Sequence, residues 1–413
     1  MSHADSTPTS LRQRDPDVAA WLQREDRRQA STLTLIASEN HCSAAVREAC
    51  SSRITDKYAE GYPSRRYYGG CEVADGLEDL ARQRALRLFA GAEEANVQPH
   101  CGTTANLAAL LALAGPNGRI VGMALKAGGH LSHGHDKSHT GMVFQARQYG
   151  VDAQGRIDLD EVRKVVLEHQ PKVLIAGGSS YSRTIDYPAF AAIAKEVGAL
   201  LLADIAHPAG LMAAGVVPSP VGIADVVTMT THKTLRGPRG GMILCTKAVA
   251  KAIHSSVFPG AQGGPLVQQI AGKAVAFGEA LQPEFRAYQQ RVLDNARHLA
   301  ACLQERGLDI VTGGTDNHIV LVDLRRTDVT GAEVEERALA AGLAVNKNAI
   351  PGDPRPPMVT SGLRLGTPAV TTRGFGKEQI ATVADVIAGL VQRQDPDRFR
   401  PVVQGLCEAF PLP

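Results

Sequence analysis

Residues 172–211 read KVLIAGGSSYSRTIDYPAFAAIAKEVGALLLADIAHPAGL, in which two short apolar runs flank a helical segment. The runs KVLIAG (172–177) and ALLLAD (199–204) are too short for ordinary helices and contain few polar residues. Between them, PAFAAIAKEVG (188–198) has the apolar spacing of an amphipathic helix. Such alternation is typical of a parallel sheet that is covered by helices on both faces.

The same alternation extends in both directions along the chain. Apolar runs at ANVQP (95–99), RIVGM (119–123) and DVVTMT (225–230) predict further strands. The segments GTTANLAALLALA (102–114) and LDEVRKVVLEH (159–169) predict helices between them. We therefore expect a large α/β domain with a mainly parallel sheet.

The C-terminal part has a different pattern. A long helical stretch at 288–307 precedes two predicted strands, HIVLVDLR (318–325) and LRLG (363–366), and helices are predicted near 330–341 and at 377–394. Few strands with helices on one side indicate a small α+β domain. The expected division is an N-terminal arm, loose to about residue 15 and then helical, at 1–30, a large domain at 31–285 and a small domain at 286–413.

Composition argues against several classes of protein. The 413 residues have a net charge of +2 with acids and bases interspersed, which is unlike a nucleic-acid-binding protein. Seven scattered cysteines without CxxC spacing indicate reduced thiols in the cytoplasm. The polar N-terminus is unlike a signal peptide, and no run approaches about 18 apolar residues. We expect a cytoplasmic protein without membrane or nucleic-acid partners.

Two residues at predicted strand ends indicate chemistry. Lys233 lies in TMTTHKTLRGPRGG (228–241), where a strand meets a loop, and Asp204 ends the apolar run LLAD. Partial burial lowers the pKa of such a lysine and makes its amine nucleophilic. A lone lysine in such a loop is usually solvated, and a lone aspartate there is usually a helix cap. Together they favour pyridoxal phosphate, which needs an amine to attach to and a carboxylate beside its ring nitrogen.

A phosphate site is indicated nearby in sequence. Gly102, Thr103 and Thr104 open a helix directly after a strand, and free amides at a helix N-terminus bind anions. Taken alone, this pattern is also that of an ordinary helix cap. The cluster His130, His133, His135 and His139 has only Asp136 as a further ligand at suitable spacing, so we expect no metal there.

Several longer stretches of the sequence resemble those of a known enzyme family. From ASEN (37–40) to TTRGF (371–375), the chain resembles serine hydroxymethyltransferase. The matching strings are KYAEGYPSRRYYGGCE (57–72), GGHLSHG (128–134), THKTLRGPRGG (231–241), FPGAQGGP (258–265), GGTDNH (313–318), VNKN (345–348) and SGLRLGTPA (361–369). The resemblance implies a fold-type-I, pyridoxal-phosphate-dependent homodimer, or dimer of dimers, with active sites between subunits. It also implies that the mainly parallel sheet of the large domain is of the seven-stranded type.

The resemblance also implies roles in cofactor binding. Lys233 would hold pyridoxal phosphate as a Schiff base, Asp204 would pair with the ring nitrogen, and Thr230 and His232 would be catalytic neighbours. The further cofactor contacts that it implies are His130 stacked on the ring, Ser179 and His207 near it, Gly102, Thr103 and His232 at the phosphate, and Gly264 and Tyr58 reaching the phosphate across the dimer interface.

For substrates, the resemblance implies that Arg364 clamps the amino-acid carboxylate, since a guanidinium meets a carboxylate with two parallel bonds. Ser38 of the same subunit and Tyr68 of the other subunit would help to bind this carboxylate. Glu60 would move a proton near the substrate hydroxyl and folate. The implied folate contacts are Leu125, Gly129, Leu131 and Asn348.

The expected reaction is transfer of a one-carbon unit between serine and tetrahydrofolate. Cys101, Thr103 and Thr104 depart from the residues usual in the family, as do Pro208 and Ala261. The departures near the cofactor leave the amino acid open. α-Methylserine hydroxymethyl transfer and folate-independent threonine transaldolase chemistry are the enzymatic alternatives, and an inactive binding protein is the non-enzymatic one. The presence of Lys233 and Arg364 disfavours the last.

Overall fold

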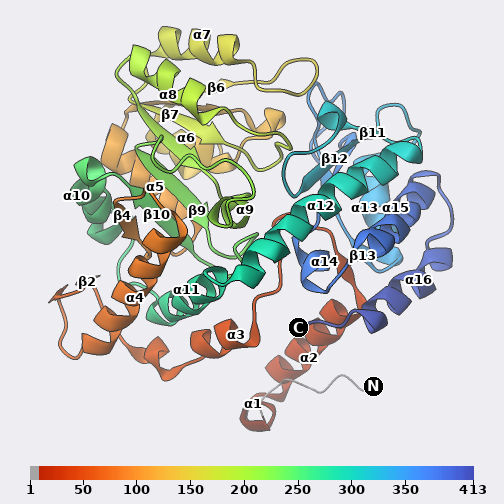
Figure 1. Cartoon of the computed structure of the whole chain (residues 1–413), viewed down its shortest axis with the longest axis horizontal. Helices are drawn as coiled ribbons and strands as arrows, with labels where there is room; N and C mark the ends of the chain where they lie inside the picture. The colour runs from red at the N-terminus through yellow and green to blue at the C-terminus, as the bar shows by residue number, and fades with distance from the viewer. Residues whose placement is uncertain (1–8) are drawn as a thin grey trace.

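Figure 1 shows the computed structural model of the chain, which describes residues 9–413. One lobe is built around a large sheet, and the other contains the C-terminal elements. The long helix α12 (Pro283–Glu305) runs diagonally between them. Both lobes have their own apolar core, in agreement with a large α/β unit followed by a smaller one.

The large sheet has seven strands in the order β4-β10-β9-β8-β7-β5-β6. All five strands predicted from apolar runs are confirmed. β6 and β10 were not predicted: β6 is an edge strand with exposed polar residues, and β10 runs antiparallel to both neighbours. The bounds are β4 Glu94–Asn96, β5 Arg119–Met123, β6 Gln145–Tyr149, β7 Val173–Gly177, β8 Leu200–Asp204, β9 Val226–Thr230 and β10 Gly241–Cys245.

Alternate residues of each strand supply a core on each face of this sheet. On one face, Val173 and Leu202 pack with α5 (Gly102–Ala114) and α10 (Lys247–Ser255). On the other, Leu174 and Leu201 pack with helices that include α4 (Glu72–Leu88), α7 (Leu159–His169), α8 (Tyr187–Glu196) and α11 (Val267–Ala280). The helices predicted at 102–114, 159–169 and 188–198 are confirmed, the last shifted by one to two residues.

The smaller lobe contains a four-stranded antiparallel sheet in the order β11-β12-β15-β14. Helix α16 (Pro396–Ala409) was not predicted, because Pro401 in its interior argues against a helix. The two predicted strands and the helices predicted near 330–341 and at 377–394 are confirmed as β12 Ile319–Asp323, β15 Gly362–Gly366, α13 Gly331–Ala340 and α15 Lys377–Val391. Three short strands were not predicted: β11 Asp309–Ile310, β13 Leu343–Ala344 and β14 Asn346–Asn348.

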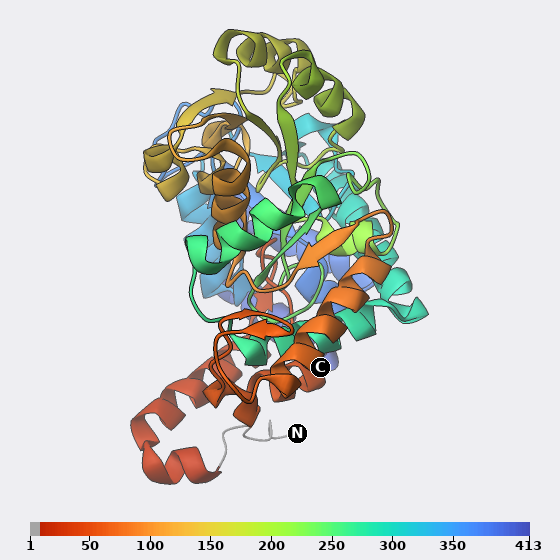
Figure 2. The ribbon, with the colours of Figure 1, turned by 90° about the vertical axis from the view of Figure 1, so that its left-hand side faces the viewer.

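The N-terminal segment differs from the prediction. Residues Thr9–Arg14 form helix α1, so the expectation of a loose arm is wrong for them, and residues 1–8 lie outside the described part. Helix α2 (Pro16–Ser31) is confirmed, and Figure 2 shows it projecting from the body. Strand β1 (Leu33–Thr34) pairs with β13, so this segment contributes to the C-terminal core. The domain boundaries at 30/31 and 285/286 stay a proposal.

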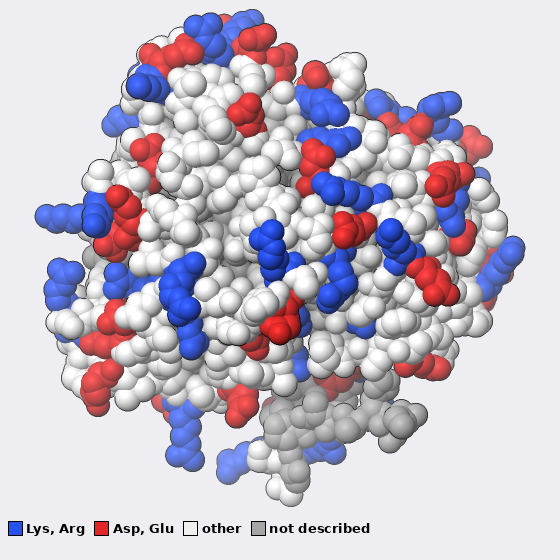
Figure 3. Space-filling model, in the orientation of Figure 1, with Lys and Arg blue, Asp and Glu red and all other residues white. Residues whose placement is uncertain are grey.

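Acidic and basic side chains are interspersed on the face shown in Figure 3, without a large area of one sign. Among residues 9–413, no helix is long and apolar enough to cross a membrane. All seven cysteines are free.

Candidate active site

The carboxyl ends of β8 and β9 and the N-terminus of α5 meet at one cavity of about 200 Å³. Such convergence at the carboxyl edge of a parallel sheet is where α/β proteins bind ligands. Most of the residues predicted for the cofactor line this cavity: Gly102, Thr103, His130, Ser179, Asp204, His207, Thr230, His232 and Lys233. The fold therefore brings together residues that are up to 131 positions apart in the sequence, between Gly102 and Lys233.

Lys233 lies in the turn that follows β9 and is only 9% exposed. Its Nζ makes no hydrogen bond or ion pair with any described residue. Burial is the main cause that lowers the pKa of Lys233, to about 8, while the nearby Asp204 carboxylate acts in the opposite direction. A buried amine with a lowered pKa and no partner is suited to act as a nucleophile.

Asp204 ends β8 and is held by three donors. Its Oδ2 accepts hydrogen bonds from Asn106 Nδ2 at 2.8 Å and His133 Nε2 at 2.9 Å, and its Oδ1 accepts one from the Ala206 amide at 2.9 Å. Burial acts to raise the pKa of Asp204, but the interactions with His133 outweigh it and keep that pKa well below its usual range. A buried, ionised carboxylate therefore faces the cavity.

His133, to which the sequence analysis assigns no role, is a direct partner of Asp204. The His130 amide donates to His133 Nδ1, so the ring carries its proton on Nε2 and donates it to Asp204. Among the described residues there is no group of three ligands that could hold a metal.

Three further histidines of the cavity are held in the neutral form. Burial lowers the pKa of His130 to about 4 and that of His232 to about 3, and it lowers that of His207 well below the ordinary value. The His207 ring stacks on His318 with centroids 5.5 Å apart. Neutral rings can pack against a flat ligand and still donate or accept one hydrogen bond.

The N-terminus of α5 and the segment Pro99–Gly102 that leads into it are suited to bind an anion, and we call this segment the anion-binding turn. A Cβ at Gly102 would lie 2.7 Å from Thr230 Cγ2, so only glycine fits there. Cys101 is the N-cap, and its Sγ accepts from the Thr104 amide at 3.4 Å. The amides of the first helical turn and the helix dipole favour an anion at this edge of the cavity.

Arg364 lies on β15 of the smaller lobe, beside the cavity. Its guanidinium donates to Ser179 O and to Asn346 Oδ1, each at 3.1 Å, while its buried Nε has no partner. No described carboxylate pairs with it, and burial lowers its pKa. A buried guanidinium without an anionic partner is costly, so this group is suited to bind a carboxylate.

The residues predicted for folate do not line the cavity, but Gly129 and Leu131 flank His130, which does. Leu125 and Leu131 are 40% and 45% exposed on two short turns, and Gly129 between them is buried. Asn348 Oδ1 accepts from Ser180 Oγ at 2.9 Å, next to the Ser179 carbonyl that Arg364 binds. An apolar surface with an amide beside it is thus available outside the carboxylate site.

Four other predicted residues are not brought to this cavity. Tyr58, Glu60, Tyr68 and Gly264 form a separate cluster, which we call the tyrosine cluster. Tyr58 Oη donates to Glu60 Oε1 at 3.4 Å, and its ring contacts that of Tyr68. Tyr58 is 56% exposed and Tyr68 47%. None of the four lines the cavity that contains Lys233.

Ser38 is half-buried in the turn after β1, and its neighbour Ala37 packs against Gly366 of β15. It therefore lies near the strand of Arg364, but no described residue accepts or donates a hydrogen bond to its side chain.

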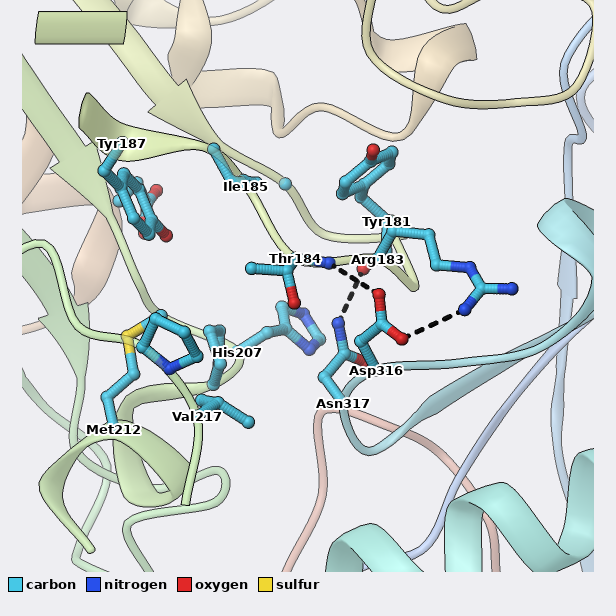
Figure 4. A pocket seen from close by; sticks show the side chains of 14 residues that line it. Tyr181, Arg183, Thr184, Ile185, Tyr187, His207, Met212, Val217, Asp316 and Asn317 are labelled. Carbon is cyan, nitrogen blue, oxygen red and sulfur yellow. Dashed lines mark hydrogen bonds and ion pairs between the residues drawn. The ribbon is translucent and has the colours of Figure 1, made fainter. Parts of the chain in front are cut away.

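A neighbouring cavity shares Gly178, Asp204 and His207 with the first (Figure 4). It opens between the two lobes. Arg183 of the large lobe forms an ion pair with Asp316 at 3.0 Å, and Asn317 Nδ2 donates to Tyr181 O at 3.0 Å. These bonds fix the lobe that carries Arg364 against the lobe that carries Lys233.

Asn106, His133, His318 and Asn346 were missed by sequence reasoning. Asn106 offered a signal, since it is the only amide in the otherwise apolar GTTANLAALLALA, where a buried polar residue needs a specific partner. The other three offered none, because their partners lie far away in the sequence.

Comparisons with known proteins agree with one another. A sequence profile described as Serine hydroxymethyltransferase matches residues 11–387. Serine hydroxymethyltransferase 1 of Pseudomonas fluorescens is 52% identical over 408 residues, which cover 98% of this chain and 99% of that protein. Serine hydroxymethyltransferase of Acinetobacter baylyi is 52% identical over 410 residues, 98% of each. The similarity extends over both lobes.

Proposed function

We propose that this chain, which belongs to the serine hydroxymethyltransferase family, transfers the hydroxymethyl group of serine to tetrahydrofolate and leaves glycine. The family has fold type I, depends on pyridoxal phosphate and uses tetrahydrofolate as co-substrate. The observation that supports the proposal most strongly is one cavity that combines an unpaired buried lysine with an ionised aspartate, beside an unpaired arginine.

The residues of the cavity fit pyridoxal phosphate. Lys233 would hold it covalently, Asp204 would pair with its ring nitrogen, and the turn at Gly102 and Thr103 would bind its phosphate. The neutral rings of His130 and His207, with Ser179 and His232, would surround it. When bound, the cofactor supplies an electron sink for the bond broken at the substrate's α-carbon.

Arg364 would bind the carboxylate of the amino acid. Its Nε has no partner and its two terminal nitrogens already hold Ser179 O and Asn346 Oδ1, so its plane is fixed before a substrate arrives. Such preorganisation lowers the entropy lost on binding. Ser38, near the same strand, would add a hydroxyl.

Glu60 would hold and move a proton at the substrate's hydroxyl group. In the single chain it lies in the tyrosine cluster, away from Lys233. We infer that the active chain is a homodimer, or a dimer of such dimers, in which Tyr58, Glu60, Tyr68 and Gly264 complete the partner's site. The exposure of Tyr58 and Tyr68 supports this inference, because large aromatic side chains are enriched at protein interfaces.

Folate would bind at the rim formed by Leu125, Gly129, Leu131 and Asn348. The two leucines offer apolar surface, and the backbone at Gly129 and the Asn348 amide offer hydrogen-bonding groups for the pterin. We also infer a cytoplasmic location, which the seven free cysteines support.

The comparisons give no support to an α-methylserine enzyme, a transaldolase or an inactive binding protein. The test is turnover of serine, α-methylserine and threonine, each with and without tetrahydrofolate. We expect a yellow protein that loses its colour on borohydride treatment, with the label on Lys233. We also expect folate-dependent turnover of serine. A colourless protein that does not take up pyridoxal phosphate would contradict it.

A further inference from the structure

A second buried lysine lies under the anion-binding turn and belongs to none of the predicted sites. Lys273 of α11 is 1% exposed. Its Nζ donates to three backbone carbonyls: Val97 at 2.6 Å, Gly241 at 2.8 Å and Pro99 at 3.1 Å. It forms no ion pair with a carboxylate of the described chain. An ammonium has three N–H donors, so the three carbonyls match its charged form completely.

The location of this cation is unusual. Burial lowers the pKa of Lys273 to about 7, because the ammonium loses its hydration there. Two of its acceptors, Val97 O and Pro99 O, lie just before the N-terminus of α5, whose dipole disfavours a cation. By contrast, Lys172 donates to the carbonyl of Ala114 at the C-terminal end of the same helix, where the dipole favours it.

Lys273 joins the two segments that form the anion-binding turn. Val97 and Pro99 lead directly into Cys101 and Gly102, and the Gly241 amide donates to the same Pro99 carbonyl at 3.0 Å. The room for the lysine is provided by Gly240, where a Cβ would lie 2.4 Å from Lys273 Cε. Removal of the ammonium would thus free three carbonyls beneath the turn.

The charge of Lys273 also reaches the cavity. It contributes to lowering the pKa of His100 and, as the smallest of several causes, that of His232, which lines the cavity beside Gly102 and Thr103. An anion bound there would be attracted by the same field, with little screening because the medium is buried protein.

We propose that Lys273 is a positioning residue for the cofactor's phosphate: it fixes the turn at Pro99–Gly102 and places an unpaired positive charge beneath it. The inference rests on the proposed function, because it assumes that the anion bound at this turn is that phosphate. It explains why a buried cation without a carboxylate partner is placed at the unfavourable end of α5.

The test compares binding of pyridoxal phosphate and of pyridoxal, which lacks the phosphate, to the full-length apo protein by equilibrium titration. Lys273→Met should raise the Kd for pyridoxal phosphate by about tenfold or more and leave that for pyridoxal nearly unchanged. Lys172→Met is the matched control, and it should alter neither. An equal loss for both ligands would mean a purely structural role, and no loss for either would also overturn the proposal.

A second variant keeps the charge but shifts it. Gly240→Ala would push the Lys273 side chain away from its carbonyls, and it should reduce the preference for the phosphorylated ligand in the same direction. If Lys273→Met does not fold, an unchanged preference in Gly240→Ala would overturn the proposal. The unchanged protein is tested in parallel: if it binds pyridoxal phosphate no better than pyridoxal, the phosphate site itself is wrong, and the proposed function fails independently of Lys273.

Discussion

The cavity at Lys233 and the tyrosine cluster differ in how complete they are within one chain. In the cavity, Asp204 has three hydrogen-bond donors and both it and Lys233 are nearly inaccessible. In the tyrosine cluster, Tyr58 and Tyr68 are half exposed, and the contact with Glu60 is a long 3.4 Å. The buried Asp204 carboxylate needs these donors from its own chain, because burial of a charged group without partners costs several kcal/mol.

This difference in exposure indicates which region we expect to contact another subunit. Lys233 and Asp204, which have to be buried, are covered by residues of their own chain. The tyrosine cluster is still exposed, so a second surface is needed to cover it. The nearby Glu60 carboxylate raises the pKa of Tyr68, so the cluster already has mutual electrostatic interactions before any partner binds. Each prediction below tests one side of this comparison or the link between the two.

The largest effect is expected at the cavity. A charged hydrogen bond contributes about 1.5–3 kcal/mol, so loss of a bidentate pair costs about 3–6 kcal/mol. At about 1.4 kcal/mol per tenfold, Arg364→Ala should lower kcat/KM for serine by roughly two to four orders of magnitude. Pyridoxal phosphate should stay bound, as measured by absorbance. Arg325→Ala, at an exposed arginine of the same lobe, is the control, and near-normal turnover of the Arg364 variant would show that the carboxylate binds elsewhere.

The next effect concerns the tyrosine cluster. Glu60→Gln keeps size and hydrogen bonding but cannot deliver a proton, and general acid-base catalysis contributes about 10²-fold or more. Folate-dependent transfer from serine should fall by that factor, while folate-independent cleavage of β-phenylserine-type substrates should be largely spared.

Glu48→Gln, on an exposed helix, serves as the control for Glu60. Intact transfer in Glu60→Gln would make the carboxylate structural only. A parent enzyme that shows no dependence on tetrahydrofolate would favour the transaldolase alternative.

The pH dependence of cofactor attachment tests the cavity without a substrate. The neutral amine of Lys233 is the nucleophile, and its pKa is lowered to about 8. The attachment rate to apo protein should therefore rise about tenfold per pH unit below pH 8 and level off above it. Stopped-flow absorbance measures this rate, and Lys233→Ala should show no attachment. A rise that continues to about pH 10, the ordinary range of a lysine, would mean that Lys233 is solvated.

The smallest effect, a factor of about two, links the two regions. If Tyr68 of one subunit completes the site of the other, dimers of the Lys233→Ala chain and dimers of the Tyr68→Phe chain should each have low activity. A mixed dimer has one site with both changes and one with neither, so isolated mixed dimers should regain about half of the parent activity. Separately tagged chains allow such dimers to be purified. Absence of recovery in proven mixed dimers would mean that each site is built from one chain.

Much of this architecture follows from local sequence. Continuous apolar runs predict β5, β7, β8 and β9, and amphipathic spacing predicts α7 and α8, because these patterns depend on residues that are neighbours in the chain. Ligands bind at the carboxyl ends of the strands in parallel α/β sheets, so the residues at these ends, Asp204 and Lys233, are predicted to be functional. β6 and β10 escape the same reasoning, since β6 is an edge strand without a continuous apolar run and β10 reverses direction.

The sequence by itself determined the chemical groups: a lysine and an aspartate at strand ends, a helix that opens on glycine and threonine, and an arginine on a C-terminal strand. Only the tertiary structure decided their partners. Asn106 and His133 fix Asp204 from 98 and 71 residues away, and Lys273 reaches Val97 across 176. The reason is physical: local patterns set which face of an element is apolar, whereas a buried polar atom takes its partner from whichever element packs against it.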